Sequence, residues 1–208
     1  MKILLTGATG YIGGRLAPLL VDADHDVRCP TRHPERLADL GWTDRAEVVR
    51  GDVLDRADVD RAMAGVDLVY YLVHAIGSGS DFAAQDRLAA RTTADAATSA
   101  GVGRIIYLGG LEPAAGEHPS PHLASRAEVG RILLEGPTPA IVLQAGVIIG
   151  SGSASFEMLR YLTERLPIMV TPRWVRSLVQ PVAVRDVLAA LLAVAGLPPR
   201  TNRRHDLG

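Results

Sequence analysis

The sequence predicts an α/β protein built on a doubly wound parallel sheet with helices on both faces. Short apolar runs, many of them rich in β-branched residues, alternate with helical patterns along the chain. A glycine-rich turn joins the first apolar run to the first helical pattern, at residues 7–14. Strands that alternate with helices form parallel pairs through right-handed crossovers, and these crossovers place helices on both faces.

The alternation predicts strands at residues 2–6, 26–31, 47–51, 68–73, 104–108 and 140–145. Each run is short and apolar on both sides, as strands buried between two helical layers are. Helices are expected at residues 11–21, 56–64, 82–100, 123–134 and 156–166, with a short one near 35–40. The sequence contains no internal repeat and no linker, so residues 1–208 are expected to form a single domain.

The turn after the first strand has the pattern of a phosphate-binding loop. Gly7, Gly10 and Gly13 are spaced so that one permits a tight turn, one permits close approach of a pyrophosphate, and one brings helix and strand together. The free N–H groups at the start of the helix favour an anion. The turn, which also contains Thr9, Tyr11 and Ile12, therefore predicts dinucleotide binding. An ordinary strand–helix turn without a ligand is the alternative.

Composition argues against several classes of partner. A formal net charge of −1 gives no basic face for nucleic acid or an anionic membrane. The longest apolar run, residues 187–196, is about half of what a membrane span needs, and residues 3–5 are too short for a signal peptide. Cys29 is the only cysteine and is expected to be buried. We expect a cytoplasmic protein with a small-molecule substrate and no metal, either monomeric or homodimeric.

Four segments resemble the short-chain dehydrogenase/reductase superfamily. They are the turn TGATGYIG at 6–13, GDVLD at 51–55, AGVGR at 100–104 and QPVAVRDV at 180–187. In this order and spacing they are similar to the atypical members, close to the extended epimerase–dehydratase branch and to NmrA-like proteins. The resemblance covers essentially the whole chain and implies a Rossmann-type NAD(P)-binding domain.

The resemblance also implies where the cofactor lies. Asp52 and Val53 would contact the adenine. Leu72, Val73, His74 and Ala75 would line the nicotinamide ribose, and residues 145–147, with Gly146 at their centre, would approach the nicotinamide ring. For His74 the alternative is a packed histidine at a strand end.

Arg32 suggests which dinucleotide is bound. The second strand ends in Thr31-Arg32, where an acidic residue would accept hydrogen bonds from the ribose 2′-hydroxyl. Arginine suits a 2′-phosphate instead, so we expect NADP, with NAD the weaker candidate. A solvated arginine at the start of a loop is the alternative.

The chain departs from the superfamily at the catalytic positions. Typical members use a tyrosine with a lysine four residues later, a serine after the fifth strand and an asparagine in the preceding helix. Here the tyrosine and lysine positions hold His122 and Arg126, the serine position falls on 109–110, with Gly110 the better match, and the asparagine position holds Asp86; the only lysine is Lys2. His122 could replace the tyrosine as proton donor, Arg126 could hold the ribose without releasing a proton, and Asp86 could orient a water molecule or hold Arg126.

Three functions therefore remain open. The first is an NADP-binding oxidoreductase acting on an unidentified small molecule. The second is a non-catalytic NADP-binding sensor or regulator, which the changed catalytic positions favour. The third is an epimerase or dehydratase that retains its cofactor.

Two long irregular segments are expected to form substrate walls. They lie near residues 112–121 and 151–181. Residues 206–208 resemble the strand from which larger relatives continue, so a C-terminal substrate domain could lie beyond Gly208.

Overall fold

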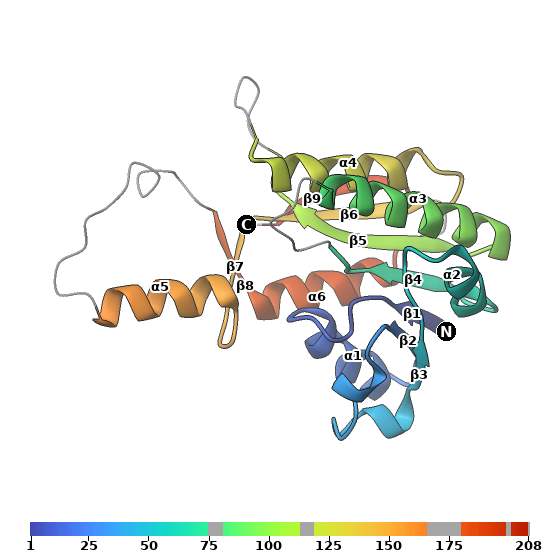
Figure 1. Ribbon diagram of the computed structural model, residues 1–208, viewed down its shortest axis with the longest axis horizontal. Helices are drawn as coiled ribbons and strands as arrows, with labels where there is room; N and C mark the ends of the chain where they lie inside the picture. Colours follow the sequence, from blue (N-terminus) through green and yellow to red (C-terminus); the bar gives the residue numbers. More distant parts are fainter. Residues whose placement is uncertain (75–80, 113–118, 166–179, 199–200, 208) are drawn as a thin grey trace.

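The computed structural model describes residues 1–74, 81–112, 119–165, 180–198 and 201–207. Its main sheet has seven parallel strands in the order β3-β2-β1-β4-β5-β6-β9 (Figure 1). The strands are β1 Lys2–Leu5, β2 Asp26–Thr31, β3 Glu47–Arg50, β4 Leu68–Tyr71, β5 Arg104–Gly110, β6 Ala140–Ala145 and β9 Arg203–Leu207. A separate parallel pair joins β7 Val147–Ile149 to β8 Pro181–Ala183. The predicted fold class is confirmed.

Helices cover both faces of the main sheet (Figure 1). On one face lie α1 Gly13–Asp22 and α6 Val184–Ala195, and on the other lie α2 Arg56–Met63, α3 Phe82–Ala100 and α4 Pro121–Glu135. Helix α5 Ala154–Arg165 packs against β7 and extends away from the main sheet (Figure 1). Alternate residues of a strand belong to two hydrophobic cores, one on each face of the sheet. In β1, Ile3 and Leu5 pack with α1 and α6, whereas Leu4 packs with α2, α3 and α4. This two-sided burial is why the strands read as continuous apolar runs.

Several boundaries differ from the expected ones. The first helix begins at Gly13, not at residue 11, because residues up to Ile12 belong to the glycine turn. The fourth helix begins earlier than expected, at Pro121, because the Ser120 hydroxyl accepts the Leu123 N–H at 3.3 Å and caps it. The helix expected near 35–40 is wrong. Only a 3-10 turn, Pro34–Arg36, forms there, and the chain turns to a left-handed φ of 61° at Asp39.

The C-terminal part contains elements beyond the six expected strands. The strand expected from residues 206–208 is present as β9, which pairs with β6 from Ile141↔Arg203 to Ala145↔Leu207. The apolar run at 187–196 forms most of α6. Within the described parts of the chain, no helix is long and apolar enough to span a membrane.

Candidate functional site

The glycine turn is closely packed between β1, α1 and the end of β4. Gly7 has a φ of +76°, and a Cβ there would lie 2.6 Å from the Leu72 carbonyl oxygen. A Cβ on Gly13 would lie 2.2 Å from the Gly7 oxygen. The Gly10 N–H donates to the Gly7 carbonyl at 2.9 Å, and no side chain caps the start of α1 at Ile12. The Gly14 and Arg15 N–H groups donate to the Gly10 and Ile12 carbonyls, so the start of α1 is closed by backbone alone and no side chain blocks it, as at helix N-termini that bind phosphate.

A cavity of about 480 Å³ lies beside this turn, at the carboxyl ends of β1 to β4. A cavity of that size is typical of small-molecule sites. It brings together many of the residues singled out in the sequence: Gly7, Thr9, Arg32, Asp52, Val53, Val73, His74 and Asp86. The cavity lining also includes residues that the sequence did not indicate, among them Leu54, Tyr71, Asp81, Phe82, Gln85 and Ala89. The ends of β1 to β4 thus converge on one site, whereas His122, Arg126 and Gly146 are not part of the cavity lining.

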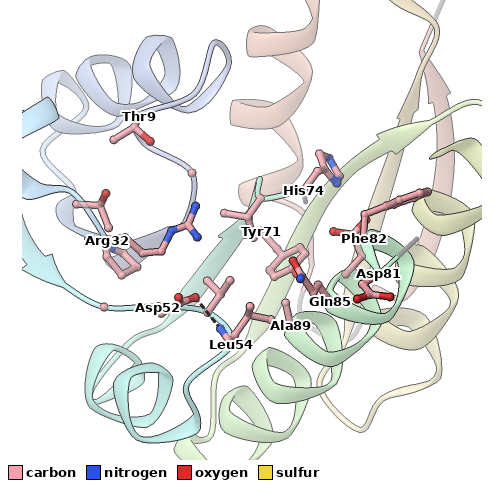
Figure 2. A pocket seen from close by; sticks show the side chains of 17 residues that line it. Thr9, Arg32, Asp52, Leu54, Tyr71, His74, Asp81, Phe82, Gln85 and Ala89 are labelled. Carbon is pink, nitrogen blue, oxygen red and sulfur yellow. Dashed lines mark hydrogen bonds between the residues drawn. The ribbon is translucent and has the colours of Figure 1, made fainter. Parts of the chain in front are cut away.

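One end of the cavity is formed by Arg32 and Asp52. Figure 2 shows the Arg32 side chain reaching into the space between Thr9 and Asp52. The Arg50 guanidinium donates to the Arg32 carbonyl at 3.2 Å, so a second cation lies beside this end. Asp52 Oδ1 accepts the Leu54 N–H at 3.0 Å, and this bond fixes the turn after β3. A solvent-facing cationic end with a fixed carboxylate suits a phosphorylated nucleoside.

The opposite end is formed by His74 and Phe82 (Figure 2). The His74 ring meets the Tyr107 ring edge-on, with centroids 5.7 Å apart, and its buried Nδ1 has no hydrogen-bond partner. The pKa of His74 is lowered to about 4, mainly by burial and also by the charge of Arg126, while Asp86 and the Leu108 carbonyl act in the opposite direction. His74 is therefore a neutral imidazole at neutral pH.

This lowered pKa predicts an acid-sensitive stability. The unfolded chain binds a proton at the ordinary histidine pKa near 6.5, whereas folded His74 binds one only near pH 4. Because the unfolded chain binds the proton more readily, the free energy of unfolding is highest above pH 6.5 and decreases as the pH falls, by about 2 kcal/mol between pH 7.5 and pH 5. Urea unfolding at both pH values should show a smaller loss in His74→Phe than in the wild type. Equal losses in both proteins would contradict the buried neutral state.

Helices α3 and α4 are joined by a buried hydrogen bond below this end. The Ser125 hydroxyl donates to Asp86 Oδ2 at 2.8 Å, and both residues are buried. The Tyr107 hydroxyl donates to the Arg126 carbonyl at 3.1 Å, linking β5 to α4. A Cβ on Gly110 would lie 3.7 Å from Arg126 Cδ, so the positions aligned with the catalytic serine and lysine are neighbours. Ser125 and Tyr107 carry no local sequence signal because their roles depend on helix packing.

His122 lies at the exposed start of α4. Its ring stacks on Phe82, with centroids 4.5 Å apart and planes inclined by 26°. Phe82 lines the cavity, so His122 is separated from that space by one aromatic ring. The space beside Gly110 is occupied instead by Leu123, whose Cδ2 would lie 2.8 Å from a Cβ on Gly110.

Gly146 lies against the residue that leads into β8, and Tyr11 contacts the segment that leads to α5. A Cβ on Gly146 would lie 2.1 Å from the Gln180 carbonyl oxygen, so only glycine allows β6 to continue into β7 here. The Tyr11 hydroxyl and Arg15 Nη2 both donate to the Ser151 carbonyl, at 3.2 and 2.8 Å. These two bonds connect the glycine turn and the start of α1 to Ser151, the first residue of the second expected substrate wall. Ala75, and residues 113–118 and 166–179 of the two walls, lie outside the described residues.

The chain matches a known family and two reductases by sequence. Residues 7–135 match the NAD(P)H-binding family. Over 106 residues the chain is 42% identical to a (4-alkanoyl-5-oxo-2,5-dihydrofuran-3-yl)methyl phosphate reductase of Streptomyces griseus subsp. griseus, covering 51% of this chain and 33% of that protein. It is 32% identical over 111 residues to a 2-alkyl-3-oxoalkanoate reductase of Stenotrophomonas maltophilia, covering 51% and 32%. The matched segment thus spans about a third of each relative.

Two solved structures share the fold. MoeE5 in complex with UDP-glucose and NAD superimposes with a TM-score of 0.79 at 20% identity, covering 100% of this chain and 76% of that one. The NAD-dependent NDP-hexosamine 5,6-dehydratase TunA gives 0.76 at 19%, covering 100% and 75%. The family match covers more than half of the chain, from Gly7 to Glu135, and the chain therefore belongs to the NAD(P)H-binding family.

Proposed function

We propose that this protein is an NADP-dependent oxidoreductase that reduces a small carbonyl compound. The observation that carries the proposal is the single cavity that runs from the glycine turn to Arg32 at one end and His74 at the other. Both relatives described above are reductases by name, which supports the direction of the reaction. NADPH supplies the hydride when it is bound.

NADP is proposed over NAD because of the charge at the Arg32 end. A 2′-phosphate there would meet Arg32 in the cavity lining, with Arg50 beside it. Hydrogen bonds between ions are stronger than neutral ones and cannot form with an unphosphorylated ribose. Arg36, exposed on the neighbouring 3-10 turn and absent from the cavity lining, provides a matched control.

Arg32→Ala should weaken NADP⁺ binding about tenfold to a hundredfold and leave NAD⁺ binding nearly unchanged. Calorimetric titration of both cofactors measures the two affinities, and Arg36→Ala should match the wild type. If Arg32→Ala weakened both cofactors equally, or neither, Arg32 would have no role in recognising the 2′-phosphate.

We assign roles in the proposed reduction to three side chains, two that contact substrate or cofactor and one that positions a helix. His122 would give a proton to the substrate oxygen, and Arg126 would hold the nicotinamide ribose. Asp86, fixed by Ser125, would keep α4 in register with α3. Residues 145–147, around Gly146, would approach the nicotinamide ring, and Leu72 and Val73 the ribose.

A non-catalytic NADP-binding sensor is the second candidate. Its support is the apolar Leu123 side chain beside Gly110, where a reductase of this superfamily would have a serine hydroxyl. The two functions are separated by monitoring NADPH oxidation with a panel of 3-oxo acids, butenolides and simple ketones. Turnover of any one supports the enzyme. NADPH binding without turnover of any of them, over hours at high protein concentration, supports the sensor.

We also propose that the protein acts in the cytoplasm. Its single thiol, Cys29, is buried, and burial raises the pKa of that thiol to about 12. Such a thiol is inert, and a chain with one cysteine gains nothing from an oxidising compartment.

A further inference from the structure

We propose that Arg15 and Tyr11 couple the glycine turn to helix α5, so that a dinucleotide phosphate bound at the turn also holds α5 in position. The inference rests on the proposed cofactor function and extends it, because it gives two side chains of the phosphate-binding segment a positioning role. Helix α5 lies in the second expected substrate wall. The coupling would therefore order the substrate side of the site when the cofactor binds.

The first observation is that two side chains from the start of α1 meet one carbonyl oxygen of the wall. The Tyr11 hydroxyl and Arg15 Nη2 donate to the Ser151 carbonyl at 3.2 and 2.8 Å. The Arg15 guanidinium also lies over the Tyr11 ring, 3.9 Å from its centroid, and Arg15 Nη1 donates to the Tyr11 carbonyl at 3.1 Å. The two side chains therefore support each other and act on Ser151 as one unit.

The second observation is that the wall leaves room for both side chains. A Cβ on Gly150 would lie 2.6 Å from the Tyr11 hydroxyl oxygen, and a Cβ on Gly152 would lie 3.3 Å from Arg15 Nη2. Gly152 also has a φ of +77°, which residues with a side chain rarely adopt. Glycine on both sides of Ser151 thus permits the close approach on which the two hydrogen bonds depend.

The third observation is that the backbone around Ser151 is bonded to α5. The Gly152 N–H donates to Glu157 Oε1 at 3.1 Å, and the Glu157 N–H donates to the Ser153 carbonyl at 2.8 Å. The Ser153 hydroxyl donates to the Ile148 carbonyl at 3.0 Å and so joins the same turn to β7. A displacement of Ser151 is therefore passed directly to the first turn of α5.

The fourth observation is that α5 lies at the margin of the fold. It packs against β7 and extends away from the main sheet (Figure 1). Its Met158 and Tyr161 side chains are 60% and 61% exposed. Segments that bury little apolar surface open at a low free-energy cost. The position of α5 is therefore sensitive to the contacts at its first turn.

The coupling follows because two events order the same residues. A phosphate on the N–H groups at the start of α1 would restrict residues 11–15, from which Tyr11 and Arg15 extend to Ser151. Whichever event comes first reduces the entropy cost of the second, which gives positive cooperativity. By linkage, the docked wall must strengthen cofactor binding by the same factor by which the cofactor stabilises the wall.

The test measures hydrogen exchange in residues 154–165 of the whole 208-residue chain, with and without saturating NADPH. In the wild type, NADPH should slow this exchange about threefold to tenfold, the effect of stabilising one or two hydrogen bonds. Arg15→Met keeps the aliphatic stem but loses the guanidinium, so NADPH should change the exchange by less than about twofold. Tyr11→Phe keeps the ring below Arg15 and removes one donor, so it should show an intermediate response.

Arg45→Met is the matched control. Arg45 Nη2 donates to Asp22 Oδ1 at 2.7 Å, so this variant removes an arginine that contacts the other end of α1 and not Ser151. Its response to NADPH should equal that of the wild type. Exchange in β1 and β5, compared without ligand, shows that each variant is folded. Because NADPH is saturating throughout, a lost response in α5 cannot be attributed to lost binding.

A second ligand separates the glycine turn from the Arg32 end of the cavity. Adenosine 2′-monophosphate can occupy the Arg32 end but has no phosphate for the turn, so at saturation it should leave exchange in α5 unchanged. Equal slowing by this ligand and by NADPH would show that the effect does not come from the turn.

Two other results would also overturn the inference while leaving the cofactor function intact. They are unchanged α5 exchange in the wild type at saturating NADPH, and equal slowing in the wild type and Arg15→Met. If Arg15→Met did not fold, Tyr11→Phe would decide in the same way, since a full wild-type response in it would contradict the coupling. A wild-type protein that binds no NADPH by calorimetry would overturn the proposed function itself.

Discussion

Replacing Gly13 with valine should weaken NADPH binding about a hundredfold or more. The Cβ of any side chain at this position would lie 2.2 Å from the Gly7 oxygen, 2.7 Å from the Gly7 carbonyl carbon and 3.0 Å from Ala8 Cα. All three are backbone atoms, so no side-chain rotation can relieve the contact. The turn itself must move, and a displacement of about 1 Å is enough to cost two orders of magnitude in a preorganised site.

Calorimetry with NADPH measures this loss, and urea unfolding shows whether the sheet survives it. Gly13→Ala should already lose most of the affinity, because the clash arises from the Cβ and not from the branches of valine. Gly41→Ala is the control, since a Cβ there would meet no atom within 4 Å. Wild-type affinity in Gly13→Val would remove the glycine turn from the binding site.

The fold was predictable because its strongest signals are local. Strands buried on both faces need apolar residues at successive positions, as Ile3, Leu4 and Leu5 provide. The failed helix near 35–40 shows the limit of such signals. Its residues are compatible with a helix, but Asp39 takes a left-handed φ, and the segment instead packs Leu37 into the core of the α1 side. That choice depends on contacts with distant residues, which a local pattern does not contain.

The residues of the candidate site likewise include some that the sequence could predict and some that it could not. Arg32, Asp52 and His74 could be found because ligands bind at the carboxyl ends of parallel strands. Phe82 and Ser125 could not be found by that rule, because they lie on helices and reach the site only through the packing of α3 against α4. The sequence showed that Gly110 lacks the serine hydroxyl, but it did not show that the Leu123 side chain fills the space beside Gly110.

His122→Phe should lower the turnover of a carbonyl substrate by about 10²–10⁴-fold, the usual contribution of a general acid. Phenylalanine keeps a ring that can stack on Phe82 and removes only the proton, so cofactor binding should persist. Steady-state rates across pH provide the second measurement. A general acid must carry its proton to act, so wild-type activity should fall toward high pH, and the variant should lack this dependence.

Two further variants separate proton transfer from position. Phe82→Leu removes the ring on which His122 stacks but leaves the imidazole, so it should lower turnover less than His122→Phe and keep the pH dependence. His25→Phe, which lies before the amino end of β2 whereas the site lies at the carboxyl ends of the strands, should behave as the wild type. Full activity and an unchanged pH profile in His122→Phe would contradict its role as proton donor. Because Gly110 has no hydroxyl and the chain has no lysine beyond Lys2, such a result would favour the NADP-binding sensor.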